Sequence, residues 1–202
     1  MRSKTFDFAL AIGGAAGDGI ATPGNILARI FIRRGLHLYA YNAYQSIIRG
    51  GHIFLTVRVG DQQVHSHGDK LDLLVCLNQD TMNRHLGLMG PDSRVIFNSD
   101  TIKPGAAGEG VWLCPMPVKE LTDNSKNKLV QNTVALGVTM SLLGLDFQIL
   151  ADALTLQFQR KGQSVVDENV GVARAGFDHA IANFEPFAGT VPSGPRPLAV
   201  WT

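Results

Sequence analysis

The chain has 202 residues, which is enough for one domain with a complete hydrophobic core. Hydrophobic residues make up 45% and charged residues 17%, and a formal net charge of +1 provides no broad basic surface, which argues against nucleic acid or a membrane surface as a partner. The first residues lack the apolar stretch of a signal peptide, and no apolar run is long enough to span a membrane, so we expect a cytoplasmic protein.

The first third of the chain predicts a strand, a tight turn, a helix and a second strand. An apolar run at residues 6–12 leads into glycines, apolar residues then recur at helical spacing up to Gly35, and residues 36–41 form another apolar run. A right-handed crossover of this kind makes the two strands parallel. It also leaves the glycine turn at the carboxyl end of the sheet, where open α/β folds bind ligands.

The middle of the chain predicts a hairpin and then buried parallel strands. Apolar and polar residues alternate from 53 to 59, and Gly60-Asp61 is expected to turn the chain into a second hairpin strand at 62–66. A polar, helix-like segment at 80–88 lies between short apolar runs. These runs favour further strands at 71–77, 94–97 and 111–113.

The remainder is expected to be helical up to a proline-rich end. Helices are predicted at 126–143, 146–160 and 167–184, and four prolines follow between 185 and 202. The sequence therefore predicts an α/β fold, a Rossmann-like open sheet with mainly parallel strands, a hairpin and a helical C-terminal third. We expect one domain at 6–184 and a proline-rich extended tail or linker at 185–202.

The glycine turn is the first candidate ligand site. Its backbone N–H groups and the following helix N-terminus form an arrangement that attracts phosphate, and its candidate residues are Gly14, Gly17, Asp18 and Gly19. The spacing differs from the dinucleotide pattern G-x-G-x-x-G, and glycines also allow a helix and a strand to pack closely. Ligand binding and close packing therefore both remain open for this turn.

A second candidate segment follows about thirty residues later. Guanidinium binds phosphate bidentately, and the two glycines after Arg49 allow another backbone to come close. The alternative is that Arg49 caps a helix or pairs with a carboxylate. The candidate ligand residues of this segment are Ser46, Arg49, Gly50 and Gly51.

Other groups point less clearly to chemistry. The second strand has no Asp or Glu at its end, which argues against a nicotinamide-dinucleotide site. His65 and His67 lie two residues apart near Asp69 and Asp72, but without a third ligand in a motif-like position a solvated hairpin is the preferred interpretation over a metal site. We interpret Asn132 and Asn169 as buried residues that fix packing. No catalytic residue is predicted.

The two cysteines, Cys76 and Cys114, both lie in apolar, strand-like surroundings, where a buried, inert thiol is the common case. An iron–sulfur cluster usually takes four thiolates. Two isolated cysteines therefore do not form a cluster site by themselves.

The ordered motifs resemble a known family. In chain order they are Gly14-Ala15-Ala16-Gly17-Asp18-Gly19, Gly35-Leu36-His37, Ser46-Ile47-Ile48-Arg49-Gly50-Gly51-His52, Asp72-Leu73-Leu74-Val75 and Asn132-Thr133-Val134-Ala135-Leu136-Gly137. Over about residues 6–184 the chain is similar to the gamma domain of 2-oxoacid:ferredoxin oxidoreductases. Its details look most like the version fused ahead of the alpha, pyrimidine-binding domain in 2-oxoglutarate:ferredoxin oxidoreductases. Ala16 and Asp18 depart from the glycine and glutamine frequent in that pattern.

The resemblance implies one component of an enzyme that oxidatively decarboxylates a 2-oxoacid, with 2-oxoglutarate expected, to an acyl-coenzyme A. It implies thiamine diphosphate, Mg and an iron–sulfur cluster on partner alpha and beta domains or subunits, electron transfer to ferredoxin, and an inactive isolated chain. It also associates the gamma domain with coenzyme A, whose phosphates fit the glycine turn and Arg49. Two alternatives remain open: a non-catalytic interaction module and a stand-alone nucleotide-binding protein.

Overall fold

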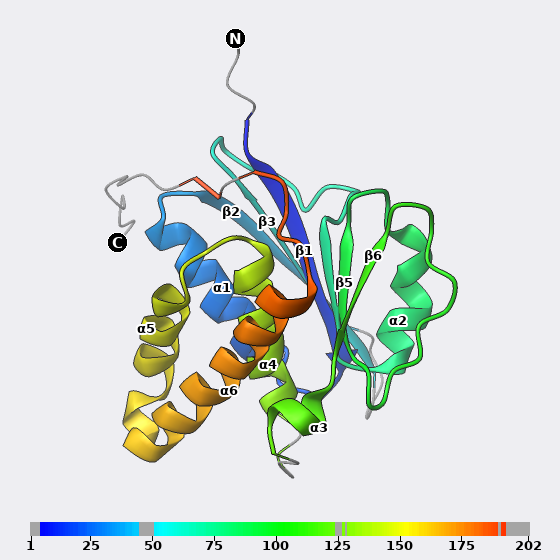
Figure 1. Ribbon diagram of the computed structural model, residues 1–202. Helices are drawn as coiled ribbons and strands as arrows, with labels where there is room; N and C mark the ends of the chain where they lie inside the picture. Colours follow the sequence, from blue (N-terminus) through cyan, green and yellow to red (C-terminus); the bar gives the residue numbers. More distant parts are fainter. Residues whose placement is uncertain (1–4, 45–50, 124–126, 128, 190, 193–202) are drawn as a thin grey trace.

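The computed structural model describes residues 5–44, 51–123, 127, 129–189 and 191–192, and these residues form a six-stranded sheet flanked by helices (Figure 1). The strand order is β2-β3-β1-β4-β5-β6. The strands are β1 (Asp7–Ala15), β2 (His37–Tyr44), β3 (His52–Gly60), β4 (Leu73–Cys76), β5 (Arg94–Asn98) and β6 (Trp112–Met116).

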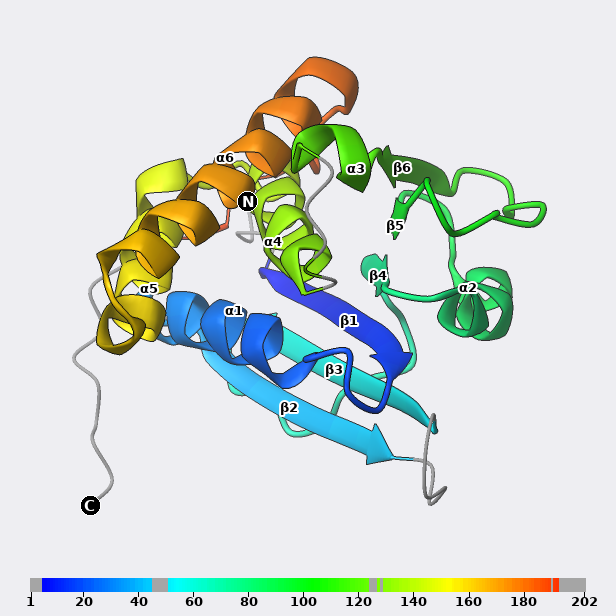
Figure 2. The ribbon, with the colours of Figure 1, turned by 90° about the horizontal axis from the view of Figure 1, so that it is seen from below.

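The helices lie on both faces of this sheet. They are α1 (Ala21–Arg33), α2 (Gln79–His85), α3 (Val118–Leu121), α4 (Val130–Leu142), α5 (Phe147–Phe158) and α6 (Gln163–Asn183), with 3-10 turns η1 (Leu86–Leu88) and η2 (Gln159–Lys161). Figure 2 shows α1, α4, α5 and α6 on one side of the sheet and α2 on the other. Among the described residues, no helix combines the length and the apolar composition needed to cross a lipid bilayer.

Alternating side chains supply each face of the sheet with its own core. Leu55 and Val57 of β3 join Leu10 and Ile12 of β1 beneath α1 and α4 in the larger core. Ala11, Leu74 and Cys76 lie on the opposite face, in a smaller core with Met82 of α2. This two-sided burial explains why β4 is a continuous apolar run, because both of its faces are covered.

Strand direction confirms the mainly parallel sheet and corrects one detail. β1 pairs in parallel with β4, β4 with β5, and β5 with β6. The expected parallel β1 and β2 do run in the same direction, but β3 lies between them and pairs antiparallel with both. The crossover through α1 therefore leaves one strand position open between β1 and β2, and β3 occupies that position.

The antiparallel pair lies in a different place from the predicted hairpin. β3 pairs with the preceding β2, from His37 opposite Gly60 to Tyr44 opposite Ile53, and residues 62–66 form no strand. The reason is that both edges of β3 are already occupied by β1 and β2. Residues 62–66 consequently have no free backbone edge of β3 with which to pair.

The C-terminal helices follow the prediction with shifted starts. Helix α4 begins at Val130 rather than 126, and residues 124–126 and 128 lie outside the described part. Helix α6 begins four residues earlier than predicted, directly after Gly162, whose φ of 104° ends the preceding turn. Within the proline-rich segment, Phe187 packs edge-on against Phe8, and Val191 is 3% exposed, so these residues contact the core.

Candidate functional site

The glycine turn after β1 is held by its own hydrogen bonds. The Ala15 N–H donates to the Asp18 carboxylate at 2.6 Å, and the Asp18 N–H donates to the Ala15 carbonyl at 3.0 Å. Gly17 and Gly19 have φ values of +99° and +72°, a left-handed conformation that glycine adopts without steric cost. The tight turn that the sequence predicted is present at these glycines.

The Asp18 side chain stabilises this turn by accepting from the Ala15 N–H, and Gly14, which has no Cβ, leaves space for the Asp18 carboxylate. A Cβ on Gly14 would lie 2.9 Å from the Asp18 carboxylate oxygen and 3.3 Å from the Leu77 Cβ. The Ala16 N–H donates to the Gly51 carbonyl at 3.1 Å. The protein therefore uses the amides of residues 15, 16 and 18 itself, and the described residues provide no acceptor for the N–H groups of Gly17 and Gly19.

The second candidate segment is only partly visible. Ser46, Arg49 and Gly50 lie outside the described residues, whereas Gly51 is described and buried. Because Ala15 lies opposite His52 in the antiparallel register, the chain enters β3 at the carboxyl end of β1. The structure thus brings Gly51 to the glycine turn, as its hydrogen bond to Ala16 shows.

Two hollows border the turn. The first, the edge cleft, has a volume of about 510 Å³ and lies where β1, β4 and β5 end. This is the switch point of the sheet, because the chain leaves β1 toward α1 on one face and β4 toward α2 on the other. Its polar lining includes Asn78, Asn98, Lys119 and Gln131.

The second hollow, the helix cavity, has a volume of about 380 Å³ and lies among α1, α4, α5 and α6. Its lining includes Gly19 and Thr22 where α1 begins, and Leu129 and Val130 where α4 begins. Neither helix has a side-chain cap or an acidic residue in its first turn. Both N-terminal ends, each with partial positive charge, border one cavity that Lys161 and Glu168 also line. At the start of α4, Asn127 accepts from the Leu129 and Val130 N–H groups.

Asn132 is a buried amide among the residues that line the helix cavity. It is 6% exposed, and its Nδ2 donates to the Asp18 carbonyl at 2.7 Å, which fixes the orientation of the amide. Within the described residues its Oδ1 has no hydrogen-bond partner. Leaving a buried acceptor unsatisfied costs about 1–3 kcal/mol.

Asn169 also lines the helix cavity and is hydrogen-bonded to Thr133, the residue after Asn132. The Thr133 hydroxyl donates to the Asn169 Oδ1 at 3.1 Å, and the Asn169 Nδ2 donates to the Val165 carbonyl. The sequence predicted that Asn132 and Asn169 form hydrogen bonds that fix packing, and both do form such bonds. It did not predict the cavity that both residues line. The available signal was that Asn132 lies in the first turn of a helix whose other residues are mostly apolar.

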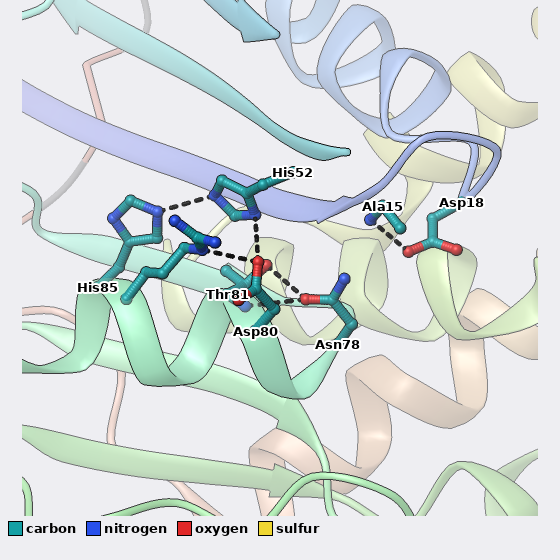
Figure 3. A network of polar contacts seen from close by, with 8 residues as sticks. Ala15, Asp18, His52, Asn78, Asp80, Thr81 and His85 are labelled. Atoms are coloured by element: carbon teal, nitrogen blue, oxygen red, sulfur yellow. Dashed lines mark hydrogen bonds and ion pairs between the residues drawn. The ribbon is translucent and has the colours of Figure 1, made fainter. Parts of the chain in front are cut away.

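A second polar cluster lies at the start of β3, on the α2 face of the sheet (Figure 3). The Nε2 atoms of His52 and His85 are 2.9 Å apart, so one imidazole donates and the other accepts. Asp80 lies 3.5 Å from the His52 Nδ1 and forms an ion pair with Arg84. Burial, followed by the charges of His52 and Arg84, lowers the pKa of His85 to about 4, and burial also lowers the pKa of His52.

This cluster predicts a specific loss of stability in acid. The unfolded chain binds a proton at His85 near pH 6.5 whereas the folded chain does so near 4, so stability is lost as pH falls between those values. The full shift corresponds to about 3 kcal/mol, which partial solvent exposure reduces to about 1–2 kcal/mol. Urea unfolding at several pH values should show a smaller acid loss in His85→Phe than in the wild type; equal losses would contradict this assignment.

Metal and cluster chemistry find no support in the described residues. No group of three or more His, Cys, Asp or Glu side chains there could hold a metal ion. Cys76 and Cys114 belong to the cores on opposite faces of the sheet. Burial raises the pKa of their thiols to about 12 and about 11, so both are protonated at neutral pH.

An open, mostly parallel sheet with helices on both faces and a glycine turn at its switch point defines the Rossmann-like class of α/β proteins. Within that class the chain belongs to the pyruvate ferredoxin/flavodoxin oxidoreductase family, whose model matches residues 9–179. This match confirms the predicted resemblance to the oxidoreductase family.

Individual relatives agree with this assignment. The ketoisovalerate oxidoreductase subunit VorA of Methanothermobacter thermautotrophicus is 29% identical over 177 residues, which are 86% of this chain and 36% of that subunit. The chain thus spans about a third of the length of this relative.

Two solved structures share the fold. The 2-oxoglutarate:ferredoxin oxidoreductase from Magnetococcus marinus, with 2-oxoglutarate, coenzyme A and succinyl-CoA bound, matches with a TM-score of 0.86 and 24% identity, covering 96% of this chain and 34% of that one. The gamma subunit of a keto/oxoacid ferredoxin oxidoreductase from Geobacter sulfurreducens matches with a TM-score of 0.69 and 22% identity, covering 87% and 99%.

Proposed function

We propose that the chain is the gamma component of a cytoplasmic 2-oxoacid:ferredoxin oxidoreductase, where it contributes to coenzyme A binding and to assembly with the alpha and beta components. Family membership supports the enzyme class. The observation that supports the ligand is the helix cavity, which Asn132 lines together with the first residues of α1 and α4.

The chemistry of the two hollows fits coenzyme A. Its phosphates are anionic groups that Lys161 and the N-terminal ends of α1 and α4 attract, and its amide, amino and hydroxyl groups are donors for lining residues such as Glu168 and Asn169. The helix cavity and the edge cleft both border the glycine turn and share Asn127, Leu129 and Val130 as lining residues. Adjoining hollows of this kind suit an elongated ligand.

The chemistry of decarboxylation is assigned to partner chains in this proposal. The two buried thiols on opposite faces of the sheet do not fit an iron–sulfur cluster. Thiamine diphosphate, Mg and the cluster therefore belong to the alpha and beta components, and ferredoxin accepts the electrons there. The isolated chain is expected to be inactive.

The test is coenzyme A binding to the purified protein with any partner chains that copurify, measured by calorimetry without oxygen. Asn132→Ala removes the buried acceptor and Arg49→Ala removes the guanidinium, so each should raise the Kd about tenfold to a hundredfold. Asn183→Ala is the matched control, because this exposed amide bonds only to His179 within the described residues and does not line either hollow.

Other outcomes separate the alternatives. An unchanged Kd in both variants contradicts the coenzyme A site. Loss of the partner chains from Arg49→Ala, without a change in ligand affinity, favours a non-catalytic interaction module. Binding of NAD by the isolated chain favours a stand-alone nucleotide-binding protein.

The proposed substrate is 2-oxoglutarate, which is bound in the Magnetococcus marinus enzyme that shares this fold. The VorA relative is a ketoisovalerate oxidoreductase subunit, so the two names differ in the 2-oxoacid. Viologen reduction by the assembled enzyme, compared for 2-oxoglutarate, pyruvate and 2-oxoisovalerate, tests this choice. A higher kcat/KM for either competitor contradicts it.

A further inference from the structure

The His52–His85 contact joins two elements whose residues are 33 positions apart in the sequence. His52 is the first residue of β3 and His85 is the last residue of α2. Their Nε2 atoms lie 2.9 Å apart and their ring centroids 5.1 Å apart. The two nitrogens therefore point at each other, in the geometry of an imidazole–imidazole hydrogen bond.

The surroundings keep this pair neutral and in place. The ring of Phe54 stacks on His85 with centroids 3.9 Å apart, and burial lowers the pKa of both imidazoles. Within the described part of the chain, the charged groups near the pair include Asp80 and Arg84, both on α2 and paired with each other at 2.7 Å. At neutral pH the pair is thus an uncharged link between α2 and the start of β3.

Helix α2 is itself anchored firmly at its other end. Asn78 caps the helix by accepting from the Thr81 N–H and hydroxyl. Thr81 packs on Gly13 of β1 so closely that a Cβ there would lie 2.3 Å from the Thr81 Cγ2. Because the N-terminal end of α2 is fixed to β1, the position of His85 at the other end of the helix is also restrained, and so is that of His52, which is hydrogen-bonded to it.

A continuous set of contacts leads from this pair to the helix cavity on the other face of the sheet. The residue before His52 is Gly51, whose carbonyl accepts from the Ala16 N–H. Ala16 lies between Ala15 and Asp18, which bond to each other and form the glycine turn. The Asp18 carbonyl then accepts from Asn132, which lines the helix cavity.

We propose that His52 and His85 are positioning residues that fix the glycine turn through Gly51 and Ala16, and thereby set the place of Asn132 in the helix cavity. The pair touches no ligand itself. The effect on coenzyme A affinity rests on the proposed function, whereas the effect on the turn stands without it.

The test compares His85→Phe with His85→Gln in the ¹⁵N-labelled protein. Phenylalanine keeps an aromatic ring on Phe54 but loses the hydrogen bond, whereas glutamine keeps a polar group near the Nε2 position. His85→Phe should lower the hydrogen-exchange protection of the Ala16 amide about tenfold or more and shift the Asn132 side-chain resonance. His85→Gln should restore protection to within about threefold of wild type.

Leu10, in the middle of β1, is the internal control, and its amide protection should not change in either variant. Unchanged Ala16 protection in His85→Phe overturns the proposal, and so does equal loss in both variants. A parallel loss at Ala16 and Leu10 also overturns it, because that result describes general destabilisation.

The same variants give the ligand readout. The Kd of coenzyme A should rise about tenfold in His85→Phe, a change that corresponds to about 1.4 kcal/mol, and return toward wild type in His85→Gln. An unchanged Kd in His85→Phe contradicts transmission to Asn132. If wild-type protein binds no coenzyme A, the proposed function fails, and the Ala16 and Asn132 resonances alone decide the positioning role.

Discussion

Gly137→Ala is expected to lower the free energy of unfolding by about 3 kcal/mol or more, and the Tm by about 6–12 °C. A Cβ at Gly137 of α4 would lie 2.0 Å from the Ala173 carbonyl oxygen and 2.8 Å from the Phe177 nitrogen, both on α6. Gly176 of α6 makes the reciprocal approach, because its Cβ would lie 2.3 Å from the Val134 carbonyl oxygen. The clash is with backbone, so relief requires the two helices to separate.

Gly171→Ala is the matched control for this prediction. Gly171 lies in the same α6, but its added Cβ meets nothing within 4 Å, so alanine should be neutral or stabilising by about 0.5–1 kcal/mol. Thermal unfolding followed by circular dichroism compares the two. A Gly137→Ala protein as stable as Gly171→Ala would show that the α4–α6 contact is looser than described.

Separation of α4 from α6 also bears on the ligand site. Asn132 lies on α4 and Asn169 on α6, and both line the helix cavity. We therefore expect folded Gly137→Ala protein, examined well below its lowered Tm, to bind coenzyme A more weakly than Gly171→Ala does.

Arg94→Met is expected to cost about 2–3 kcal/mol and to expose the segment after α6 to proteases. Arg94 is 8% exposed, and its guanidinium donates to the carbonyls of Glu185 and Pro186 at 3.2 and 2.8 Å. It also lies 3.9 Å from the centre of the Phe187 ring. Methionine fills much of the volume but leaves these carbonyls without their donor.

Arg174→Met is the control for Arg94. Arg174 also lies over an aromatic ring, 3.7 Å from the centre of Phe147, but its side chain is 50% exposed and its ion pair with Asp178 is solvated. We expect a loss below about 1 kcal/mol. Urea unfolding and limited proteolysis measure both variants; equal stability and equal cleavage between residues 184 and 192 would contradict the role of Arg94.

The sequence predicted most elements because their signals are local. The run into the glycines identified β1 and its turn, and Asp146 before a helical run marked the start of α5, where its side chain accepts from the Gln148 N–H. The positive φ values of Gly17 and Gly19 follow the same logic, since only local sterics decide them.

The sequence did not predict which strands are neighbours. Alternation in residues 53–59 identified β3 but not its partners, because a strand with one apolar face can pair with any compatible edge. Similarly, no residue near Arg94 in the sequence indicated that its guanidinium would donate to the carbonyls of Glu185 and Pro186, 91 and 92 residues later.

The candidate site divides in the same way. The sequence by itself determined the glycine turn as a candidate site and the family resemblance, because both rest on short contiguous motifs. The tertiary structure alone decided that Asn132 would donate to Asp18, 114 residues away, and line a cavity among four helices. Whether a buried amide is satisfied depends on atoms that long-range packing brings to it, and that packing is a property of the whole fold.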